Sequence, residues 1–299
     1  MPSIAVFGGT GYLASLIKNQ NNVKKNNYTF FSRKKSKKNY INFLSLKKNL
    51  DILKKFDFII HLAGPNQDQL KRNKGLIKKK NEITSVICDA CLAHNIKLIY
   101  ISSMQVYNDY GKNHISMNCK INQKNIYSIS HHKSEKIIIK KFLKHKKMFT
   151  ILRMGNVFGL KKNNNLKEIN SNLLHDLCFL ALKKKKIIIR NGSVQRTFVP
   201  SQIFIRVIDS IIKKNFFNNS IINISYKSLN LKNISEIIQK RLNLLFNLHI
   251  EIVLKKFDND KKFLIYANRN FKFNPLDKKI YQEIDQILKL IKKNYFINS

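Results

Sequence analysis

The feature that most constrains this fold is a glycine-containing loop between two apolar segments near the start of the chain. The loop Gly8–Ala14 (GGTGYLA) follows a predicted buried strand over Ser3–Gly8 and opens a predicted helix over Gly11–Asn19. Glycine permits unusual dihedral angles and close backbone approach, and a helix N-terminus supplies amide donors. This order is typical of a Rossmann-type domain that binds a dinucleotide. The spacing is GxxGxxA, with Ala14 in place of a third glycine. A glycine-rich turn without a ligand is the alternative.

Predicted strands and helices alternate beyond the loop. Strands are predicted over Tyr28–Ser32, Tyr40–Leu44, Phe56–Ala63, Lys97–Ser102 and Phe149–Arg153. Helices are predicted over Leu46–Lys55, Lys78–His94 and Ser130–His145. Such alternation predicts βαβ units and a parallel sheet, and therefore an α/β fold with a doubly wound sheet over residues 1–160.

After about Gly159 the alternation loosens. A strand is predicted over Ile187–Ile189, and helices over Leu173–Leu182, Ile203–Lys213, Ile234–Leu245 and Ile280–Lys292. We interpret residues 161–299 as mainly a smaller α/β substrate lobe, from which a segment of about 194–225 returns to the first domain.

The charge is strongly basic, with 57 Lys and Arg against 17 Asp and Glu and a net charge of +40. Lysine, asparagine and isoleucine are abundant throughout, even in predicted core segments, and no nucleic-acid-binding motif accompanies them. We therefore rank a nucleic-acid partner last, although the positive field favours anionic substrates and cofactors. No run of 18 apolar residues is present, so no membrane-spanning helix is expected. The first residues resemble a strand and not a signal peptide, which predicts a cytoplasmic protein.

Cys88 and Cys91 form a CxxC motif, a pattern that occurs in redox and zinc sites. No second CxxC is present, and both cysteines lie on one face of a predicted helix. We interpret them as buried helix cysteines, and we predict no metal site.

The end of the second predicted strand bears on cofactor choice. No Asp or Glu occurs between residues 1 and 50, whereas NAD-specific sites often place a carboxylate here. Ser32 and Arg33 suit a 2′-phosphate, because the arginine fork matches phosphate geometry. This favours NADP(H) over NAD(H).

Further segments follow the glycine loop in order. They are His61–Gly64 (HLAG), Ser102–Tyr107 (SSMQVY), Leu152–Gly159 (LRMGNVFG), Arg190–Val199, and Ile222–Ile224 followed by Leu229–Ile238. Together they resemble the extended short-chain dehydrogenase/reductases, a family of nucleotide-sugar epimerases, dehydratases and reductases. The resemblance covers most of the chain.

The resemblance implies binding roles. Cofactor contacts would come from the glycine loop, the end of the second strand, the segment after the His61 strand and a helix asparagine, namely Gly8, Thr10, Gly11, Tyr12, Leu13, Ser32, Arg33, Leu62, Ala63, Gly64 and Asn81. Asn156 and Arg196 would contact the diphosphate of a nucleotide-sugar substrate, with backbone support in the lobe as the alternative. In the family, the histidine at the end of this strand, which corresponds to His61, usually has a positional role and not a catalytic one.

The resemblance also implies catalytic roles. Ser103 stands where the family carries its catalytic Ser or Thr, and Tyr127 begins a segment similar to the run Y-x-x-S-K-x-x-x-E. His131 occupies the place of the lysine, which in the family holds the nicotinamide ribose and lowers the tyrosine pKa. Lys133 is about 200° around a helix from that position and points away.

We therefore expect NAD(P)-dependent reduction or epimerisation of a nucleotide-activated sugar, with Tyr127 as general acid/base and His131 in place of the lysine. Met104 and Gln105 stand where dehydratases carry an Asp-Glu pair, which disfavours dehydration. A non-catalytic dinucleotide-binding scaffold or regulatory protein is the alternative, motivated by His131. The resemblance also implies a homodimer through the helices Lys78–His94 and Ser130–His145.

Overall fold

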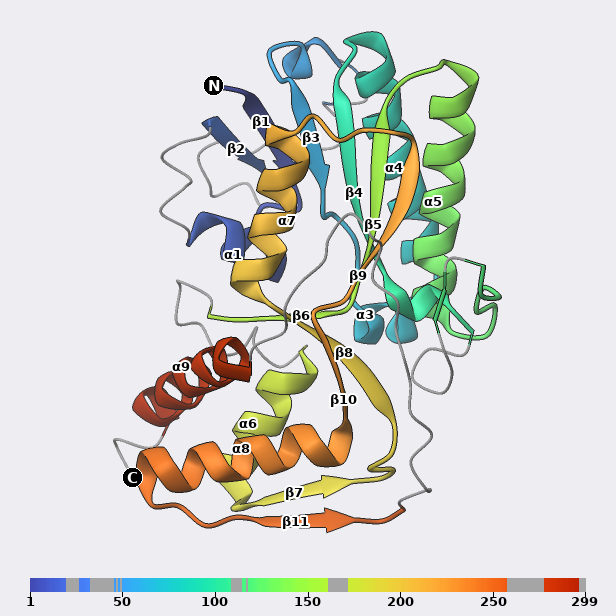
Figure 1. Ribbon diagram of the computed structural model, residues 1–299. Coiled ribbons are helices and arrows are strands. Elements are labelled where there is room, and N and C mark those ends of the chain that lie inside the picture. Colours follow the sequence, from blue (N-terminus) through green and yellow to red (C-terminus); the bar gives the residue numbers. More distant parts are fainter. Residues whose placement is uncertain are drawn as a thin grey trace. The chain divides into compact units, whose positions relative to one another are not determined.

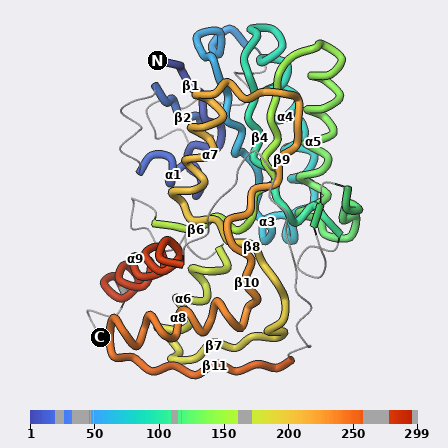
Figure 2. Tube along the Cα trace, viewed as in Figure 1, coloured from blue at the N-terminus to red at the C-terminus, as the bar shows by residue number. Residues whose placement is uncertain are grey.

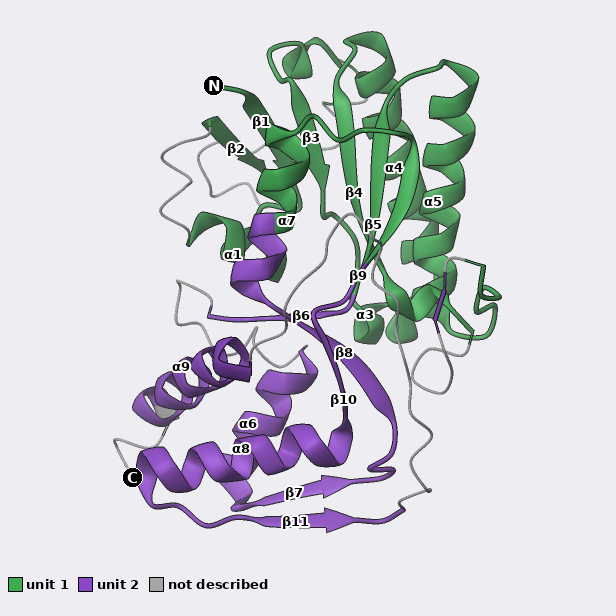
Figure 3. Cartoon of the chain, viewed as in Figure 1, with its two compact units in different colours: residues 1–108, 117–154, 207–223 green, residues 109–116, 155–206, 224–299 purple. Residues whose placement is uncertain are grey.

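The computed structural model describes residues 1–19, 27–32, 46, 48, 50–108, 115–116, 118–160, 172–256 and 277–295. The chain divides into two compact units (Figure 3). Unit 1 comprises residues 1–108, 117–154 and 207–223, and unit 2 comprises residues 109–116, 155–206 and 224–299. The predicted strand Tyr40–Leu44 and the cofactor candidate Arg33 lie outside the described residues.

Unit 1 is built on a six-stranded sheet in the order β2-β1-β3-β4-β5-β9 (Figures 1 and 2). Its strands are β1 (Ser3–Phe7), β2 (Asn27–Phe31), β3 (Phe58–His61), β4 (Lys97–Ser103), β5 (Phe149–Met154) and β9 (Ser220–Ile224). The pairings β1–β2, β1–β3, β3–β4 and β4–β5 are parallel. Strand order reverses on either side of β1, and open α/β sheets bind ligands at the carboxyl ends of the strands at such a point. The predicted doubly wound α/β fold is confirmed.

Helices α4 (Leu76–Ala93) and α5 (Ile126–Lys144) pack together on one face of this sheet. Alternate strand residues point to that face because side chains alternate along a strand. The resulting apolar core includes Phe7, Ile59, Tyr100, Ile87 and Phe142. Cys88 and Cys91 are fully buried in the same core, which confirms their interpretation as buried helix cysteines.

Several element boundaries differ from the sequence prediction. Helix α5 begins four residues earlier than predicted, because the Asn125 side chain caps it by accepting a hydrogen bond of 2.9 Å from the Tyr127 amide. Helix α1 spans Tyr12–Lys18. The short helix α3 (Gln67–Arg72) was not predicted. Where a helix was predicted over Leu46–Lys55, the described residues include a 3₁₀ turn over Leu50–Leu53.

Unit 2 contains a three-stranded sheet in the order β10-β8-β6 and a parallel pair of strands, β11 and β7. These strands are β6 (Asn156–Phe158), β7 (Lys186–Ile189), β8 (Gln195–Pro200), β10 (Lys227–Asn230) and β11 (Glu251–Leu254). Helices α6 (Leu173–Lys184), α8 (Leu231–Phe246) and α9 (Asp277–Tyr295) pack against one another, and α7 (Ser201–Lys213) crosses from unit 2 into unit 1. No helix among the described residues is long and apolar enough to cross a membrane.

Candidate active site

The glycine loop joins β1 to α1 and lies against the segment that follows β3. Gly8 has a φ of +92°, and a Cβ atom there would lie 2.9 Å from the Ala63 nitrogen. The Gly11 amide donates to the Gly8 carbonyl over 2.8 Å, and Gly11 forms the N-terminal cap of α1. A side chain at Gly8 would therefore be both strained and crowded. Of the remaining predicted loop contacts, Thr10, Tyr12 and Leu13 are half-buried.

The segment after β3 is held by backbone and imidazole contacts. The Leu62 amide donates to the Phe7 carbonyl over 2.9 Å, and the Ala63 amide donates to His61 Nδ1 over 3.3 Å. His61 Nε2 pairs with Thr84 Oγ1 at 3.0 Å. Burial, followed by the charge of Lys80, lowers the pKa of His61 to about 3. His61 is thus a neutral, fully bonded residue, which fits the positional role expected from the sequence.

Ser103 and Tyr127, the two residues expected to act on the substrate, lie in contact. Ser103 is the last residue of β4, and Tyr127 lies in the first turn of α5. The Ser103 side chain lowers the pKa of the nearby Tyr127 phenol, but burial has the larger effect and raises this pKa to about 12. Both side chains are half-buried at the carboxyl end of the parallel strands. The sequence separates them by more than twenty residues, and the fold joins them.

His131 lies one helical turn after Tyr127 on the same face of α5. The two rings meet edge to face with centroids 4.6 Å apart, and His131 Nδ1 pairs with the Tyr100 hydroxyl at 3.0 Å. Burial, with smaller effects from Lys80 and His61, holds the pKa of His131 well below its ordinary value. His131 is therefore a neutral imidazole at physiological pH and contributes no positive charge.

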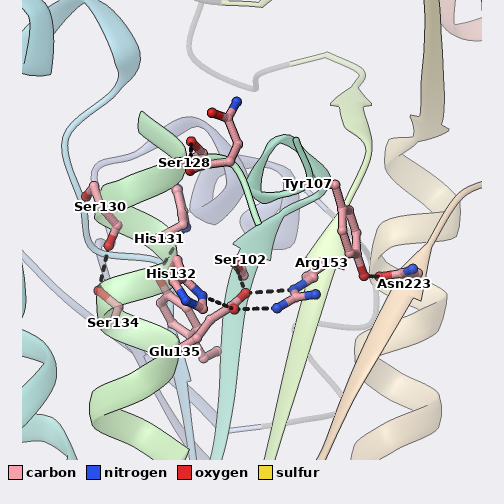
Figure 4. A network of polar contacts seen from close by, with 12 residues as sticks. Ser102, Tyr107, Ser128, Ser130, His131, His132, Ser134, Glu135, Arg153 and Asn223 are labelled. Carbon is pink, nitrogen blue, oxygen red and sulfur yellow. Dashed lines mark hydrogen bonds and ion pairs between the residues drawn. The ribbon is translucent and has the colours of Figure 1, made fainter. Parts of the chain in front are cut away.

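A buried polar network anchors α5 to the sheet one turn further on (Figure 4). The Glu135 carboxylate accepts hydrogen bonds from Arg153 Nε at 3.0 Å and Nη2 at 2.7 Å, and from Ser102 Oγ at 2.6 Å. The guanidinium of Arg153 also covers the Tyr107 ring, 4.8 Å from its centroid. Ser102 belongs to β4 and Arg153 to β5. This network therefore fixes the position of α5 on the sheet, and with it the position of Tyr127 relative to Ser103.

Asn81 and its neighbour Lys80 occupy the inner side of α4. Lys80 is only 2 % exposed, and a Cβ atom at Gly64 would lie 3.1 Å from its Cε. Lys80 Nζ and Asn81 Oδ1 are both buried without a hydrogen-bond partner in the part of the chain that the structure describes. Asn81 was predicted from the sequence as a cofactor contact, and Lys80 was not. One face of α4 carries the buried residues Lys80, Thr84, Ile87, Cys88 and Cys91. Their helical spacing was the signal in the sequence for the burial of Lys80.

The remaining predicted residues belong to other segments of the chain. Ser32 is half-buried directly after β2. Asn156 and Arg196 belong to unit 2, where Asn156 Nδ2 donates to the Thr197 carbonyl over 3.1 Å and Arg196 Nη1 donates to the Gln195 carbonyl over 2.8 Å. Among the described residues, no group of His, Cys, Asp or Glu side chains is arranged to hold a metal ion.

Solved structures with the same fold cover almost the whole chain. UDP-N-acetylglucosamine 4-epimerase from Methanobrevibacter ruminantium M1, in complex with UDP-N-acetylmuramic acid, matches with a TM-score of 0.77 and 20% identity, covering 98% of both chains. UDP-glucose 4-epimerase from Bifidobacterium longum, in complex with NAD+ and UDP, gives 0.76 and 16%, again over 98% of both chains. RMD from Pseudomonas aeruginosa, complexed with NADPH, gives 0.72 and 15% over 98% of this chain and 100% of that one.

No curated protein matches the sequence. A family model does match, over residues 4–225, and its description is the NAD dependent epimerase/dehydratase family. The match includes the glycine loop, Ser103, Tyr127 and the Glu135–Arg153 network. With the fold and this geometry, it shows that the chain belongs to the NAD-dependent epimerase/dehydratase family.

Proposed function

We propose that this protein catalyses the NAD(P)-dependent reduction or epimerisation of a nucleotide-activated sugar. The observation that carries the proposal is that the side chains of Ser103 and Tyr127 lie close together at the carboxyl end of β4. This pair lies in the same unit as the glycine loop, at the carboxyl end of a strand two places from β1 in the same sheet. An acid/base residue beside a dinucleotide site is the arrangement that hydride transfer at a carbinol requires.

The residues of unit 1 fit a nicotinamide dinucleotide. Gly8 lets the backbone of the loop approach closely, and Gly11 opens α1. The unpartnered Lys80 Nζ and Asn81 Oδ1 offer a donor and an acceptor to such a ligand. We infer that NADP(H) is preferred, because Arg33 and Ser32 follow β2 and no carboxylate occurs between residues 1 and 50. A bound nicotinamide would supply the hydride for a reduction, or would take it up and return it for an epimerisation.

The side chains of Ser103 and Tyr127 divide the proton chemistry. Ser103 would donate a hydrogen bond to the reacting sugar oxygen and polarise it. Tyr127 would exchange a proton with the same oxygen. Because burial raises the pKa of Tyr127 to about 12, its phenol is protonated at neutral pH and is set to donate. Acting as a base requires a nearby positive charge to stabilise the phenolate.

The substrate class is inferred from two sources. Two of the similar structures are named as epimerases of UDP-sugars. Met104 and Gln105 have no carboxylate to offer, so reduction or epimerisation is favoured over dehydration. We assign Asn156 and Arg196 to the substrate diphosphate. We also expect a homodimer, as the resemblance implies, and a cytoplasmic location.

The direct test is turnover of a panel of UDP-, dTDP- and GDP-sugars with NADP(H) and NAD(H), followed by chromatography of the sugar nucleotides. Tyr127→Phe should lower turnover at least about 100-fold. Tyr281→Phe, in unit 2, is the matched control and should leave turnover unchanged. If Tyr127→Phe converts the active substrate as fast as the unchanged protein does, the acid/base assignment is wrong.

A non-catalytic dinucleotide-binding scaffold is the second candidate, and the neutral His131 favours it. In a scaffold, His131→Lys would leave the protein inactive towards the whole panel. In a slow enzyme, the same change should accelerate turnover, because the lysine would restore a charge beside Tyr127.

A further inference from the structure

Lys80 carries a buried amine that forms no ion pair within the part of the chain that the structure describes. Its side chain is 2 % exposed, and its Nζ has no hydrogen-bond partner among the described residues. The nearest acidic charge that acts on it is Glu135, whose carboxylate is already bound by Arg153 and Ser102. Burial of a charge without a partner is strongly unfavourable. Such a group is expected where a ligand completes its surroundings.

The position of Lys80 relates it to the candidate cofactor site. Its stem packs against Gly64, where a Cβ atom would lie 3.1 Å from Cε and 3.6 Å from Nζ. Gly64 directly follows Ala63, which the glycine loop contacts at Gly8. The ammonium therefore lies beneath the same segment that forms one wall of the loop.

The same ammonium also lies close to the imidazole that replaces the family lysine. Lys80 Nζ is 5.9 Å from the centroid of the Tyr100 ring, and the Tyr100 hydroxyl pairs with His131. The charge of Lys80 contributes to the low pKa of His131. His131 in turn meets the ring of Tyr127. The amine of Lys80, which belongs to α4, is thus connected to Tyr127 through the side chains of Tyr100 and His131.

We propose that Lys80 supplies the ammonium that the sequence lacks at position 131, by donating hydrogen bonds to the nicotinamide-ribose hydroxyls of a bound NADP(H) or NAD(H). The proposal rests on the dinucleotide-dependent function proposed above. Burial is the largest influence on the pKa of Lys80 and lowers it to about 7, so acceptor groups of a ligand would favour its charged form.

The test compares dissociation constants by nicotinamide fluorescence and calorimetry. NADPH and NADH are titrated, and so are their adenosine diphosphate halves, which lack the nicotinamide riboside. Lys80→Met should weaken binding of the whole dinucleotide about 10- to 100-fold, the range of a charge-assisted hydrogen bond. It should change binding of the adenosine half less than about twofold. Lys79→Met, an exposed lysine on the same helix, is the control.

A pH series provides a second readout. The groups that face Lys80 are His61, Tyr100, His131 and Glu135, and none of them changes charge between about pH 6 and pH 9, because their pKa values are displaced far from this range. Affinity of the unchanged protein for NADPH should therefore fall as the pH rises above about 7, as Lys80 loses its proton. In Lys80→Met the affinity should be constant.

The outcomes distinguish failure of the proposed role of Lys80 from failure of the proposed function. The role of Lys80 is supported if Lys80→Met weakens binding of the whole dinucleotide but not of the adenosine half, and if the affinity of this variant for NADPH does not change with pH. Equal weakening of the adenosine half, or no weakening at all, overturns it while leaving the proposed function intact. If the unchanged, folded protein binds no dinucleotide, the proposed function fails and the role of Lys80 fails with it.

Discussion

The Glu135→Gln substitution gives a sharp test of how α5 is held against the sheet. Glu135 is fully buried, and its carboxylate accepts hydrogen bonds from Arg153 and Ser102. Burial raises its pKa, but the bonds from His132, Arg153 and Ser102 and the charge of Arg153 outweigh this effect and lower the pKa to about 2. The fall from 4.5 to about 2 corresponds to about 3 kcal/mol of folding free energy at neutral pH.

The sign of the pH effect follows from the lowered pKa. The stabilisation is present above the unfolded-state pKa of 4.5 and is lost as the pH falls from there towards 2. Glu135→Gln leaves the buried guanidinium of Arg153 without its anion, which costs about 3–5 kcal/mol at pH 7. Urea unfolding followed by circular dichroism should show this loss. The difference in free energy of unfolding between Glu135→Gln and the unchanged protein should be smaller by about 2 kcal/mol at pH 3 than at pH 7.

The exposed Glu82→Gln on α4 is the matched control and should change the free energy of unfolding by less than about 0.5 kcal/mol. A loss below about 1 kcal/mol in Glu135→Gln, or a gap that is the same at both pH values, would refute the idea that this ion pair anchors α5.

Two further predictions concern the glycine loop and α4. Gly8→Ala places a Cβ 2.9 Å from the Ala63 nitrogen at a φ of +92°, so it should cost about 1–3 kcal/mol by thermal unfolding and weaken dinucleotide binding at least about tenfold. Lys80→Met should stabilise the protein at neutral pH, since burial lowers the folded-state pKa of Lys80 from 10.5 to about 7 and the cost of burial is largest while the amine is charged. This advantage, at most about 5 kcal/mol, should shrink between about pH 7 and pH 10. If the difference in free energy of unfolding between Lys80→Met and the unchanged protein is the same at pH 7 and at pH 10, the lowered pKa of Lys80 is contradicted.

The fold was predictable where local signals are strong. The glycine loop, the apolar strands and the long helices have periods and breakers that act over a few residues. Helix α3 was missed because its six residues bury only Leu70, and one apolar residue shows no period. The start of α5 was placed late because the cap at Asn125 was not recognised, although it sets Tyr127 in the first turn.

The candidate site was predictable only in part, for a physical reason. Ser103 and Tyr127 were selected from a resemblance, and the fold joins them. The partner of Glu135 was not predicted, because its contact with Arg153 depends on the register of α5 on β5. Lys80 was hidden among many lysines. Its distinction lies in burial against Gly64, which depends on a contact between distant segments.

The proposed function requires that the glycine loop binds a nicotinamide dinucleotide. The measurement that tests it most directly is titration of the purified protein with NADPH and with NADH, followed by nicotinamide fluorescence, and repeated with Arg33→Ala. We predict tight binding of NADPH that weakens in the variant, because Arg33 would contact the 2′-phosphate. Binding of neither nucleotide would contradict the oxidoreductase or epimerase function and would leave a scaffold on the same fold.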